Sequence, residues 1–402
     1  MKPAGVDPTP LHRHHHSFGE VFVPDCLSST HPWNSSAVRM NGSHTDPQLR
    51  DGPQLGDDQL QAHLLQGVSR TFALTIPQLP EGLARAVSNA YLLCRIVDTI
   101  EDEVSLDSAQ KRQFCSQFIE VVAGRTPAEA LAEDLAPRLS ETTLPAEHEL
   151  IRLIPRVIAI THGLEPAQRE ALSLCVEIMG QGMAEFQDRE LRNGLATMAE
   201  MDRYCYYVAG VVGEMLTRLF CHYSPEIAAH RERLMALAVS FGQGLQMTNI
   251  LKDVWDDHDR HVCWLPQEIF DATGYRLADL VPGHDDPRFR EGFKRLIAIA
   301  HGHLRNALEY TLLIPGHETG IREFCLWALG MAVLTLRKIN ANLDFSASSQ
   351  VKISRSSVKA TIAVSRISLR SNLMLQSAFY LAGLGLPHTD RHSLVAAASS
   401  QS

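Results

Sequence analysis

Aspartates repeat at helical spacing in two separate stretches of this sequence. The first stretch, DTIED, covers residues 98–102, and the second, NILKDVWDD, covers residues 249–257. Residues four apart in an α-helix lie on one face, so each stretch places two aspartates one turn apart. Such like charges destabilise a helix by roughly 0.2–0.5 kcal/mol per pair unless a positive charge lies between them. Hard divalent cations and the diphosphates that they carry suit that position.

The polar face of each stretch continues toward the N-terminus of its expected helix. Because apolar residues cover the other faces, each polar stripe predicts a polar cavity inside an otherwise apolar bundle. For the first stretch, a solvated acidic helix end is the competing interpretation. The stripes consist of Tyr91, Arg95, Asp98 and Asp102 in the first stretch, and Gln246, Asn249, Asp253 and Asp257 in the second.

The ligand atoms of the second stripe are carboxylate and amide oxygens, which suit Mg²⁺. Lys252 and Arg260 beside it are candidate donors to a diphosphate, although a solvated surface position is the default for both residue types. Upstream, SRTF at 69–72 opens a further helix that could turn a guanidinium and N-terminal amides toward an anion. An ordinary helix N-cap is the simpler interpretation of that string.

A string of tyrosines and glycines, YCYYVAGVVG, covers residues 204–213 between the two acidic stretches. Glycine inside a helix is less favourable than alanine by about 1 kcal/mol, so Gly210 and Gly213 indicate close approach of another helix or a ligand. A tight helix crossing explains the glycines alone. The tyrosines beside them are candidates for lining a cavity.

The elements that must position these residues are helices. From Gln59 onward apolar residues recur three and four apart, and no strand-like alternation interrupts them. The pattern predicts an all-α domain over residues 56–390, with a disordered extension over 1–55 and a flexible tail over 391–402. The expected helices cover residues 83–100, 112–122, 149–160, 169–186, 201–220, 231–254, 289–313, 323–343 and 357–384.

Composition narrows the functional class. The net charge of −9 and the pI near 6.1 argue against a general nucleic-acid binder. The eight cysteines include no Cys-x-x-Cys pair and predict buried free thiols in a reducing compartment. No secretory signal and no run of 18 apolar residues is present, which favours a cytoplasmic protein. The apolar stretch 372–386 is too short to span a bilayer, and a peripheral membrane contact stays open.

The chain resembles the squalene/phytoene synthase family from about Ser69 to Leu384. Two acidic motifs in this order, with the tyrosine and glycine string between them, form a specific signature. The resemblance implies an all-α, single-domain class I isoprenoid-synthase helical bundle with a central cavity, in which the two acidic helices face each other and hold Mg²⁺. The matching strings are SRTFA at 69–73, YLLCRIVDTIEDE at 91–103, YCYYVAGVVG at 204–213, QMTNILKDVWDD at 246–257 and WLPQE at 264–268.

Carried over position by position, the resemblance implies a role for each matching residue. Tyr207 is similar to the tyrosine that the family places near the cyclopropylcarbinyl intermediate, and it joins Asp98, Asp102, Asp253 and Asp257 as the implied catalytic group. The implied metal ligands are Asp98, Glu101, Asp102, Asn249, Asp253 and Asp257. The implied substrate contacts are Ser69, Arg70, Phe72, Tyr91, Arg95, Gln246, Asn249 and Lys252.

The activity implied by the resemblance is the head-to-head condensation of two farnesyl diphosphates through presqualene diphosphate, followed by reduction with NADPH to squalene. WLPQE and Phe324-Cys325 are similar to squalene-type strings. Lys352 and Arg355 are candidates for contacting NADPH by resemblance only, and a solvated basic face is the competing interpretation. Alternatives are a dehydrosqualene or phytoene synthase, which omits the reduction, and a non-catalytic helical assembly protein. The oligomeric state stays open.

The sequence departs from the family pattern at two places that concern the reductive step. The Gly-Arg pair that usually follows the second acidic motif is replaced by His261-Val262, with Arg260 as the nearest arginine. After Phe324-Cys325, the squalene-type Ala-Ile-Pro-Gln string is replaced by Leu-Trp-Ala-Leu at 326–329.

Overall fold

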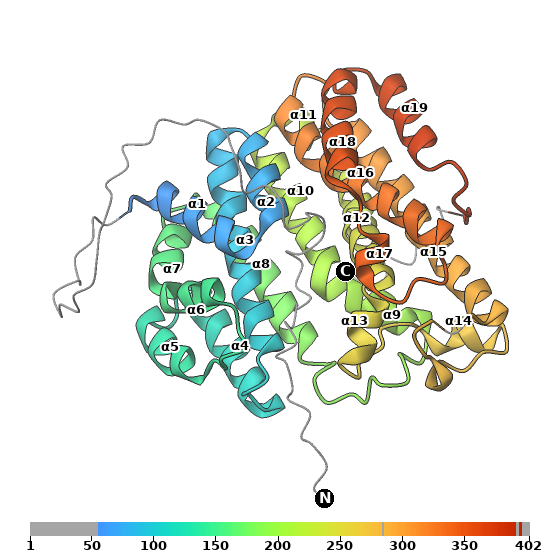
Figure 1. Ribbon diagram of the computed structural model, residues 1–402. Coiled ribbons are helices and arrows are strands. Elements are labelled where there is room, and N and C mark those ends of the chain that lie inside the picture. The colour runs from blue at the N-terminus through green and yellow to red at the C-terminus, as the bar shows by residue number, and fades with distance from the viewer. Residues whose placement is uncertain (1–54, 284, 391–393, 396–402) are drawn as a thin grey trace, which may run out of the picture.

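The computed structural model describes residues 55–283, 285–390 and 394–395 of the chain. Within these residues the only β feature is an isolated bridge between Leu195 and Pro266, so the all-α prediction is confirmed. The expected extension 1–55 and tail 391–402 lie almost wholly outside the described residues. The α-helices, labelled in Figure 1, are α1 (Asp57–Val68), α2 (Arg70–Thr75), α3 (Glu81–Asp102), α4 (Ser108–Val122), α5 (Ala128–Leu135), α6 (Pro145–Arg152), α7 (Ile154–His162), α8 (Pro166–Met183), α9 (Met198–Cys205), α10 (Val211–Tyr223), α11 (Pro225–Ala228), α12 (Arg231–Lys252), α13 (Val254–Asp259), α14 (Gln267–Asp271), α15 (Pro287–Leu313), α16 (Thr319–Ala341), α17 (Ser348–Val351), α18 (Arg355–Ser368) and α19 (Asn372–Ala382).

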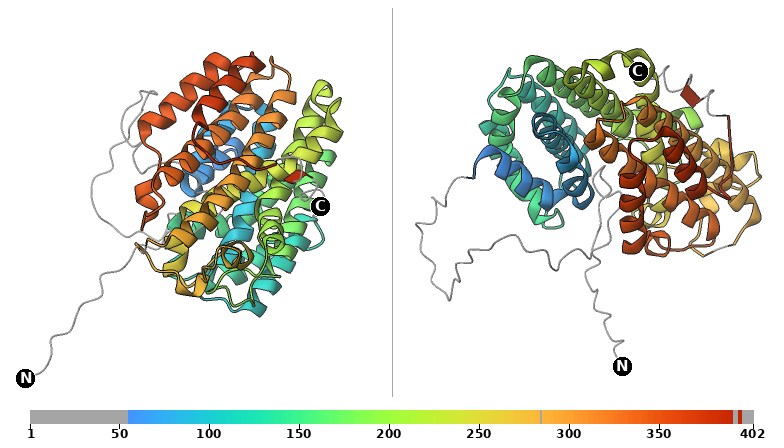
Figure 2. Two further views of the ribbon diagram at one scale, coloured as in Figure 1. Left: turned by 90° about the vertical axis from the view of Figure 1, so that its right-hand side faces the viewer. Right: turned by 90° about the horizontal axis from the view of Figure 1, so that it is seen from above.

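A row of five helices crosses the middle of the molecule. α3 packs against α8, α8 against α10, α10 against α12, and α12 against α15. Figure 1 shows α1 and α4 to α7 on one side of this row and α14 and α16 to α19 on the other, and Figure 2 shows the molecule from two further directions. One continuous apolar core joins both sides, from Phe118 in α4 through Phe220 in α10 to Trp327 in α16.

The two long helices that carry the acidic stretches each contain a long unbroken run of buried residues. Every residue of α3 from Asn89 to Ile100 is buried, and so is every residue of α12 from Leu237 to Lys252. A helix that is buried on all faces normally carries apolar residues all round. Charged side chains on these two helices therefore require partners inside the bundle, because an unpaired buried charge is strongly unfavourable.

Several expected helices are interrupted. The run 149–160 divides into α6 and α7, because Pro155 has no N–H to donate and suits only the first turn of a new helix. The run 201–220 divides into α9, a π-helical turn at Tyr206–Gly210, and α10. The run 357–384 divides into α18 and α19. Apolar periodicity continued through each break, so the sequence pattern did not reveal it.

The glycines of the tyrosine and glycine string mark a close helix crossing. A Cβ atom on Gly213 of α10 would lie 2.2 Å from the carbonyl oxygen of Ala238 in α12. On the opposite side, a Cβ atom on Gly242 of α12 would lie 2.2 Å from the carbonyl oxygen of Ala209. Only glycine permits backbones to approach this closely, and the crossing holds the π-helical turn against α12.

Two expectations about the environment of the chain can be compared with the structure. The seven cysteines among the described residues are buried and free, as expected, while Cys26 lies outside the described residues. One described helix, α16, is long and apolar enough to cross a membrane, yet 67% of its apolar window is buried inside the bundle. That burial is typical of a core helix.

α13 ends in a Schellman motif that carries histidine where glycine is usual. The N–H of Val262 donates to the carbonyl of Asp257 at 3.0 Å, and the N–H of His261 donates to the carbonyl of His258 at 2.9 Å. His261 has φ of 62°, the left-handed conformation that such a cap requires. The family pattern has glycine at this position. His261 therefore adopts the left-handed backbone conformation that the cap requires, although it is not glycine.

We therefore expect His261→Gly to stabilise the fold. A non-glycine residue in the left-handed conformation destabilises the folded state by about 1–2 kcal/mol. Glycine removes this strain but gives the unfolded chain more conformational freedom, which offsets about 0.5–1 kcal/mol of the stabilisation. Urea denaturation should show the free energy of unfolding rising by roughly 0.5–1 kcal/mol. The matched control is Gly274→Ala at φ of 76°, which should lower it by a similar amount. If both variants raised the free energy of unfolding, or both lowered it, this explanation would be contradicted.

Candidate active site

The polar stripe of α3 lies inside the bundle as predicted. Tyr91, Arg95 and Asp98 are buried, while Glu101 and Asp102 at the end of the helix are half-buried. The stripe is therefore not a solvated helix end. Removal from water raises the pKa of Asp98 to about 8, although the charge of Arg95 acts in the opposite direction. Burial also raises the pKa of Glu101 to about 7, against the hydrogen bond that it accepts from Gln187.

Arg95 has a partner that the sequence did not indicate. Its Nη2 atom binds the carboxylate of Glu147 in α6, and both side chains are buried. Its Nε and Nη1 atoms have no hydrogen-bond partner among the described residues. Arg95 thus balances the charge of Glu147 and Asp98 while keeping two buried donors for an additional acceptor. The contact of Arg95 with a diphosphate stays a prediction.

The second acidic stretch crosses a helix junction. α12 ends at Lys252 and α13 begins at Val254, so Asp253 lies between two helices that were expected to be one. The backbone hydrogen bonds from Asp253 to Asn249 and from Asp257 to Asp253, both 2.9 Å long, still follow helical spacing. Gln246, Asn249, Asp253 and Asp257 accordingly stay on one side and are all buried.

Cationic side chains accompany the aspartates of the second stretch. The Nζ atom of Lys252 lies 3.0 Å from Oδ2 of Asp253, and Lys252 is buried. Arg260 binds the carboxylate of Asp257. Both cations were candidate diphosphate donors, and in this structure both contact the aspartates. The Oδ1 atom of buried Asn249 has no hydrogen-bond partner among the described residues, which leaves an oxygen ligand atom available beside these carboxylates.

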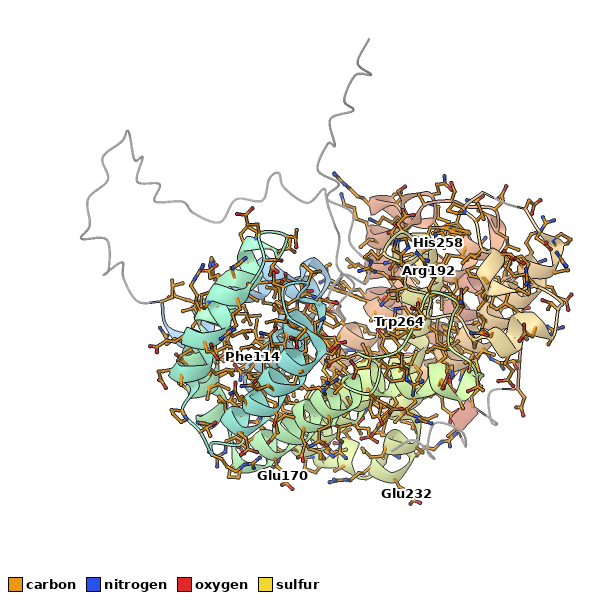
Figure 3. All side chains as sticks on the ribbon, turned by 90° about the horizontal axis from the view of Figure 1, so that it is seen from below. Phe114, Glu170, Arg192, Glu232, His258 and Trp264 are labelled. Carbon is orange, nitrogen blue, oxygen red and sulfur yellow. The ribbon has the colours of Figure 1, made fainter. Side chains whose placement is uncertain are left out.

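Carboxylates from both acidic stretches raise the pKa of the Tyr204 phenol. Removal from water raises the pKa of Tyr204, and the negative charges of Asp257, Asp102 and Glu101 raise it further. The Tyr204 ring stacks on Trp264 with ring centroids 3.7 Å apart. Figure 3 shows Trp264 in the half of the molecule that also contains Arg192 and His258, opposite the half that contains Phe114. The charges of both stretches therefore reach the region around this one aromatic pair.

This region offers oxygen atoms that suit a hard cation. Carboxylates and the unpartnered Asn249 amide oxygen are the ligands that Mg²⁺ prefers. Among the described residues, however, no three His, Cys, Asp or Glu side chains converge as a metal site. Asp253 and Asp257 instead contact Lys252 and Arg260, and the positive charge of Arg95 acts on Asp98. The chemistry of the donor set fits Mg²⁺, and the six metal ligands stay a prediction.

Tyr207 lies in the π-helical turn and is held by the end of α8 and the residues after it. A Cβ atom on Gly182 of α8 would lie 2.1 Å from the Tyr207 ring, so the ring rests directly on that glycine. The Tyr207 hydroxyl donates to Oε2 of Glu185 at 3.4 Å. Arg203 and Arg189 hold the other Glu185 oxygen at 2.8 and 2.9 Å. The orientation of Tyr207 is therefore fixed from two sides.

An apolar cavity of about 20 Å³ lies next to the α3 stripe. The Phe72 and Tyr91 rings line it, with centroids 5.0 Å apart, and Phe324 of α16 lines it beside Phe72, with ring centroids 6.4 Å apart. Ser69 caps α2 by accepting from the Phe72 amide at 3.0 Å, which confirms the N-cap interpretation. The side chain of Arg70 lies outside the described part of the chain.

The candidate cofactor residues lie on the surface. Lys352 follows α17 and Arg355 begins α18, and both side chains are exposed. α17 packs against α13, so Lys352 follows an element that contacts the second acidic stretch. These exposed positions are compatible with the competing interpretation, in which the two residues belong to a solvated basic face.

Sequence reasoning missed three residues of the site and the stacking of two others. Glu147, Glu185 and Gly182 belong to stretches that carried no motif, and their roles depend on contacts 52, 22 and 25 residues away along the chain. Tyr204 and Trp264 did lie in matching strings, but nothing in either string indicated that the two rings stack.

Comparison with known proteins places these motifs in a family. The sequence profile of the squalene/phytoene synthase family matches residues 65–357. The chain is 29% identical to a squalene synthase from Cyberlindnera jadinii over 69% of its length, and 30% identical to one from Saccharomyces cerevisiae over 70%. It spans 61% of the length of each of these two relatives.

Solved structures show the same architecture. TcSQS in complex with the ligand BPH1237 is 25% identical, with a TM-score of 0.66, and the match covers 86% of this chain and 99% of that one. A dehydrosqualene synthase in complex with a ligand is 21% identical, with a TM-score of 0.56 over 78% of this chain and 97% of that one, which supports the fold alone.

The contact between Gly182 and Tyr207 generates a prediction. We expect Gly182→Ala to lower the free energy of unfolding by about 1–3 kcal/mol, because the new methyl group overlaps the Tyr207 ring. In a Tyr207→Ala background this loss should shrink by at least about 1 kcal/mol, since the obstructing ring is absent. Chemical denaturation of the four proteins measures the coupling. Gly82→Ala in α3, where nothing lies within 4 Å, is the control and should be neutral or stabilising. An equal loss in both backgrounds would refute the contact.

Proposed function

Because the chain belongs to the squalene/phytoene synthase family, we propose that it joins two farnesyl diphosphates head to head, through presqualene diphosphate, and reduces the product to squalene with NADPH. In this reaction the protein is a farnesyl-diphosphate farnesyltransferase. Both of the relatives compared above are named squalene synthase, which supports this activity over the other activities of the squalene/phytoene synthase family.

One observation carries the proposal. Two sets of carboxylates, from the end of α3 and from the junction of α12 and α13, act on the same Tyr204 phenol. An apolar cavity is lined by Tyr91 of the same helix, α3. A prenyl diphosphate needs both environments, a charged one for its diphosphate and an apolar one for its chain. α3 borders both kinds of region, and the apolar cavity, about 20 Å³ in this structure, must widen to admit the prenyl chain.

The residues of the site have distinct tasks in the proposed reaction. Mg²⁺, held by the six candidate ligands, would stabilise the charge that develops on the departing diphosphate. Arg95, whose Nε and Nη1 atoms have no hydrogen-bond partner among the described residues, would bind the same anion. Phe72, Tyr91 and Phe324 exclude water from the apolar side, which protects an allylic carbocation.

Tyr207 is assigned to the cyclopropyl stage of the reaction. Burial and the negative charge of Glu185 raise the pKa of Tyr207, so its hydroxyl keeps its proton near neutral pH. A neutral phenol held at a fixed angle can stabilise a nearby cation through its ring face without quenching it. Gly182 and Glu185 position that ring.

The reductive step rests on the family assignment. Lys352 and Arg355 would contact the phosphates of NADPH, and the packing of α17 on α13 supports a cofactor beside the second acidic stretch. A dehydrosqualene or phytoene synthase is the second candidate, favoured by the two departures at 261–262 and 326–329. We assign the enzyme to the cytoplasm with prenyl diphosphate as its ligand and no nucleic-acid partner.

Incubation with farnesyl diphosphate and Mg²⁺, with and without NADPH, tests the proposal. We expect presqualene diphosphate without NADPH and squalene with it, identified by mass spectrometry. Dehydrosqualene in both incubations would assign the second candidate, and geranylgeranyl diphosphate as the only accepted substrate would assign a phytoene synthase. Failure to release diphosphate from either substrate would refute both.

We expect Asp98→Ala and Asp253→Ala each to reduce turnover of farnesyl diphosphate on the order of 10²–10³-fold, the loss typical of removing one preorganised electrostatic group. The helical circular dichroism signal should be unchanged, because neither change removes apolar packing. Asp271→Ala, the same change at an exposed position, is the control and should retain activity. Wild-type turnover in either of the first two variants would contradict the assignment.

A further inference from the structure

The chain between α8 and α9 lies against both acidic stretches, although it carries none of the matching motifs. Gln187 donates from Nε2 to Oε2 of Glu101, at the end of the first stretch. Further along, Nη2 of Arg192 lies 3.3 Å from Nδ1 of His261, just after the second stretch. This connecting segment, residues 184–197, therefore reaches from one acidic stretch to the other.

The backbone on either side of Gln187 is anchored by other side chains. Phe186 is buried, and its ring packs edge-on to Tyr204 with ring centroids 5.4 Å apart. Asp188 accepts a hydrogen bond from Nη1 of Arg112 in α4 at 2.6 Å. Because these neighbours hold the segment in place, the bond from Gln187 to the first acidic stretch is not needed for attachment.

Half of the Gln187 amide is left without a partner. Its Nε2 atom donates to Glu101, whereas its Oε1 atom is buried and has no hydrogen-bond partner among the described residues. Buried polar atoms in folded proteins are normally hydrogen-bonded, so this acceptor calls for a donor. An ionised carboxylate beside it cannot supply one. A water molecule bound to a cation can, because Mg²⁺ retains several of its waters.

The carboxylate that Gln187 holds differs from other candidate metal ligands. Asp253 and Asp257 contact cationic side chains. The Glu101 carboxylate instead accepts from a neutral amide, and Lys111 binds the backbone carbonyl of that residue. Within the described residues, no hydrogen bond engages the second carboxylate oxygen, Oε1. The amide therefore occupies one oxygen and leaves the negative charge and the other oxygen to a cation.

We propose that Gln187 is a positioning residue of the magnesium site. Its amide N–H holds one oxygen of Glu101 and leaves the other to the cation, while its Oε1 atom accepts from a metal-bound water. Hydrogen bonds of this kind orient metal-binding carboxylates, and removing one typically weakens metal affinity or activity about 10–100-fold. The inference rests on the proposed function, in which Glu101 binds Mg²⁺, and extends that site to a residue outside all five matching strings.

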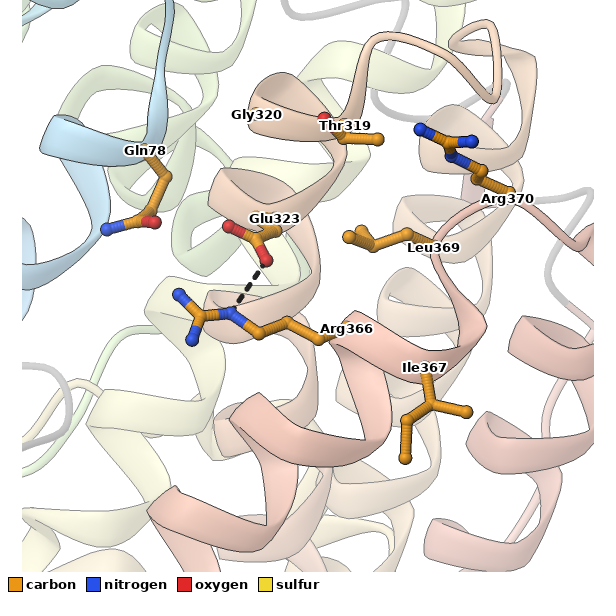
Figure 4. A pocket seen from close by; sticks show the side chains of 8 residues that line it. All are labelled: Gln78, Thr319, Gly320, Glu323, Arg366, Ile367, Leu369 and Arg370. Atoms are coloured by element: carbon orange, nitrogen blue, oxygen red, sulfur yellow. Dashed lines mark hydrogen bonds and ion pairs between the residues drawn. The ribbon is translucent and has the colours of Figure 1, made fainter.

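The pocket at the start of α16 offers no competing site for a divalent cation. It has a volume of about 420 Å³, and Figure 4 shows the side chains that line it. The one carboxylate among them, Glu323, is paired with Arg366 at 3.0 Å, and Arg370 adds a second guanidinium. Two positive groups repel a divalent cation, so this pocket does not contribute to its binding.

Binding of Mn²⁺ to the full chain, measured by electron paramagnetic resonance, tests the proposal without turnover. Mn²⁺ takes the same octahedral oxygen ligands as Mg²⁺. We expect Gln187→Leu to raise the Kd for Mn²⁺ about 10–100-fold, because leucine keeps most of the side-chain bulk but removes both amide contacts. The Mg²⁺ concentration that gives half-maximal diphosphate release from farnesyl diphosphate should rise by a similar factor. Saturating Mg²⁺ should restore most of the wild-type rate.

Two matched variants separate positioning from attachment. Gln181→Leu removes a similar bond, from Nε2 of Gln181 to Oε1 of Glu177 at 3.4 Å, on the exposed surface, and should leave Mn²⁺ binding unchanged. Asp188→Asn weakens the neighbouring anchor to Arg112 and should change Mn²⁺ affinity little, because that ion pair is exposed and screened by solvent. Unchanged Mn²⁺ affinity in Gln187→Leu, an equal loss in Asp188→Asn, or no Mn²⁺ binding by the wild type would overturn the proposal.

This inference and the proposed function can fail separately. If the wild type converts farnesyl diphosphate while Gln187→Leu binds Mn²⁺ as tightly as the wild type, the proposed function stands and the role of Gln187 is refuted. If Mn²⁺ affinity falls as expected but the wild type releases no diphosphate from farnesyl diphosphate, Gln187 positions a metal site and the proposed reaction is refuted.

Discussion

The structure depends on keeping carboxylates out of water inside an apolar bundle. Asp98 is buried on α3, Asp253 is buried at the junction of α12 and α13, and Asp257 is buried in α13. Desolvation of an ionised group is unfavourable by several kcal/mol, so each must be neutralised or paired. In this structure Asp98 has a raised pKa, and Lys252 and Arg260 contact the other two. A cation bound between the two stretches would remove the same penalty, and this links the stability of the fold to the ligand that it holds.

The approach of α10 and α12 determines where the aromatic residues lie relative to those charges. Gly213 and Gly242 allow the two backbones to touch, and no larger residue fits at either position. The contact holds the π-helical turn against α12. Tyr207 then lies on Gly182, on the side of the turn that faces α8. A glycine crossing therefore places the aromatic side chains, and the acidic stretches on α3 and α12 supply the charge beside them.

The parts of the site that followed from the sequence are those encoded within one helix. Helical spacing predicted both polar stripes, and burial of Asp98 and Asp253 confirmed that they lie in the interior. What spacing could not predict depends on contacts between distant segments. The Arg95 to Glu147 pair joins α3 to α6, and the rings of Tyr204 and Trp264 stack across 60 residues. The break at Asp253 was also missed, because helical hydrogen bonds continue across it and the apolar pattern is unchanged.

The departure at 326–329 has a direct structural consequence in α16. Ala328 stands where the squalene-type string has proline, and proline inside a helix removes one backbone hydrogen bond and bends the axis. α16 accordingly runs unbroken from Thr319 to Ala341. Trp327 beside it is buried in the core, with the Arg366 guanidinium 5.4 Å from its ring. Phe324, one turn earlier, thus lines the apolar cavity from an unbroken helix that Trp327 anchors in the core. The departures at 261–262 and at 326–329 therefore differ in kind. The one at His261 keeps the backbone conformation expected of the family and changes only the side chain, whereas the one in α16 removes the residue that would bend the wall of the cavity.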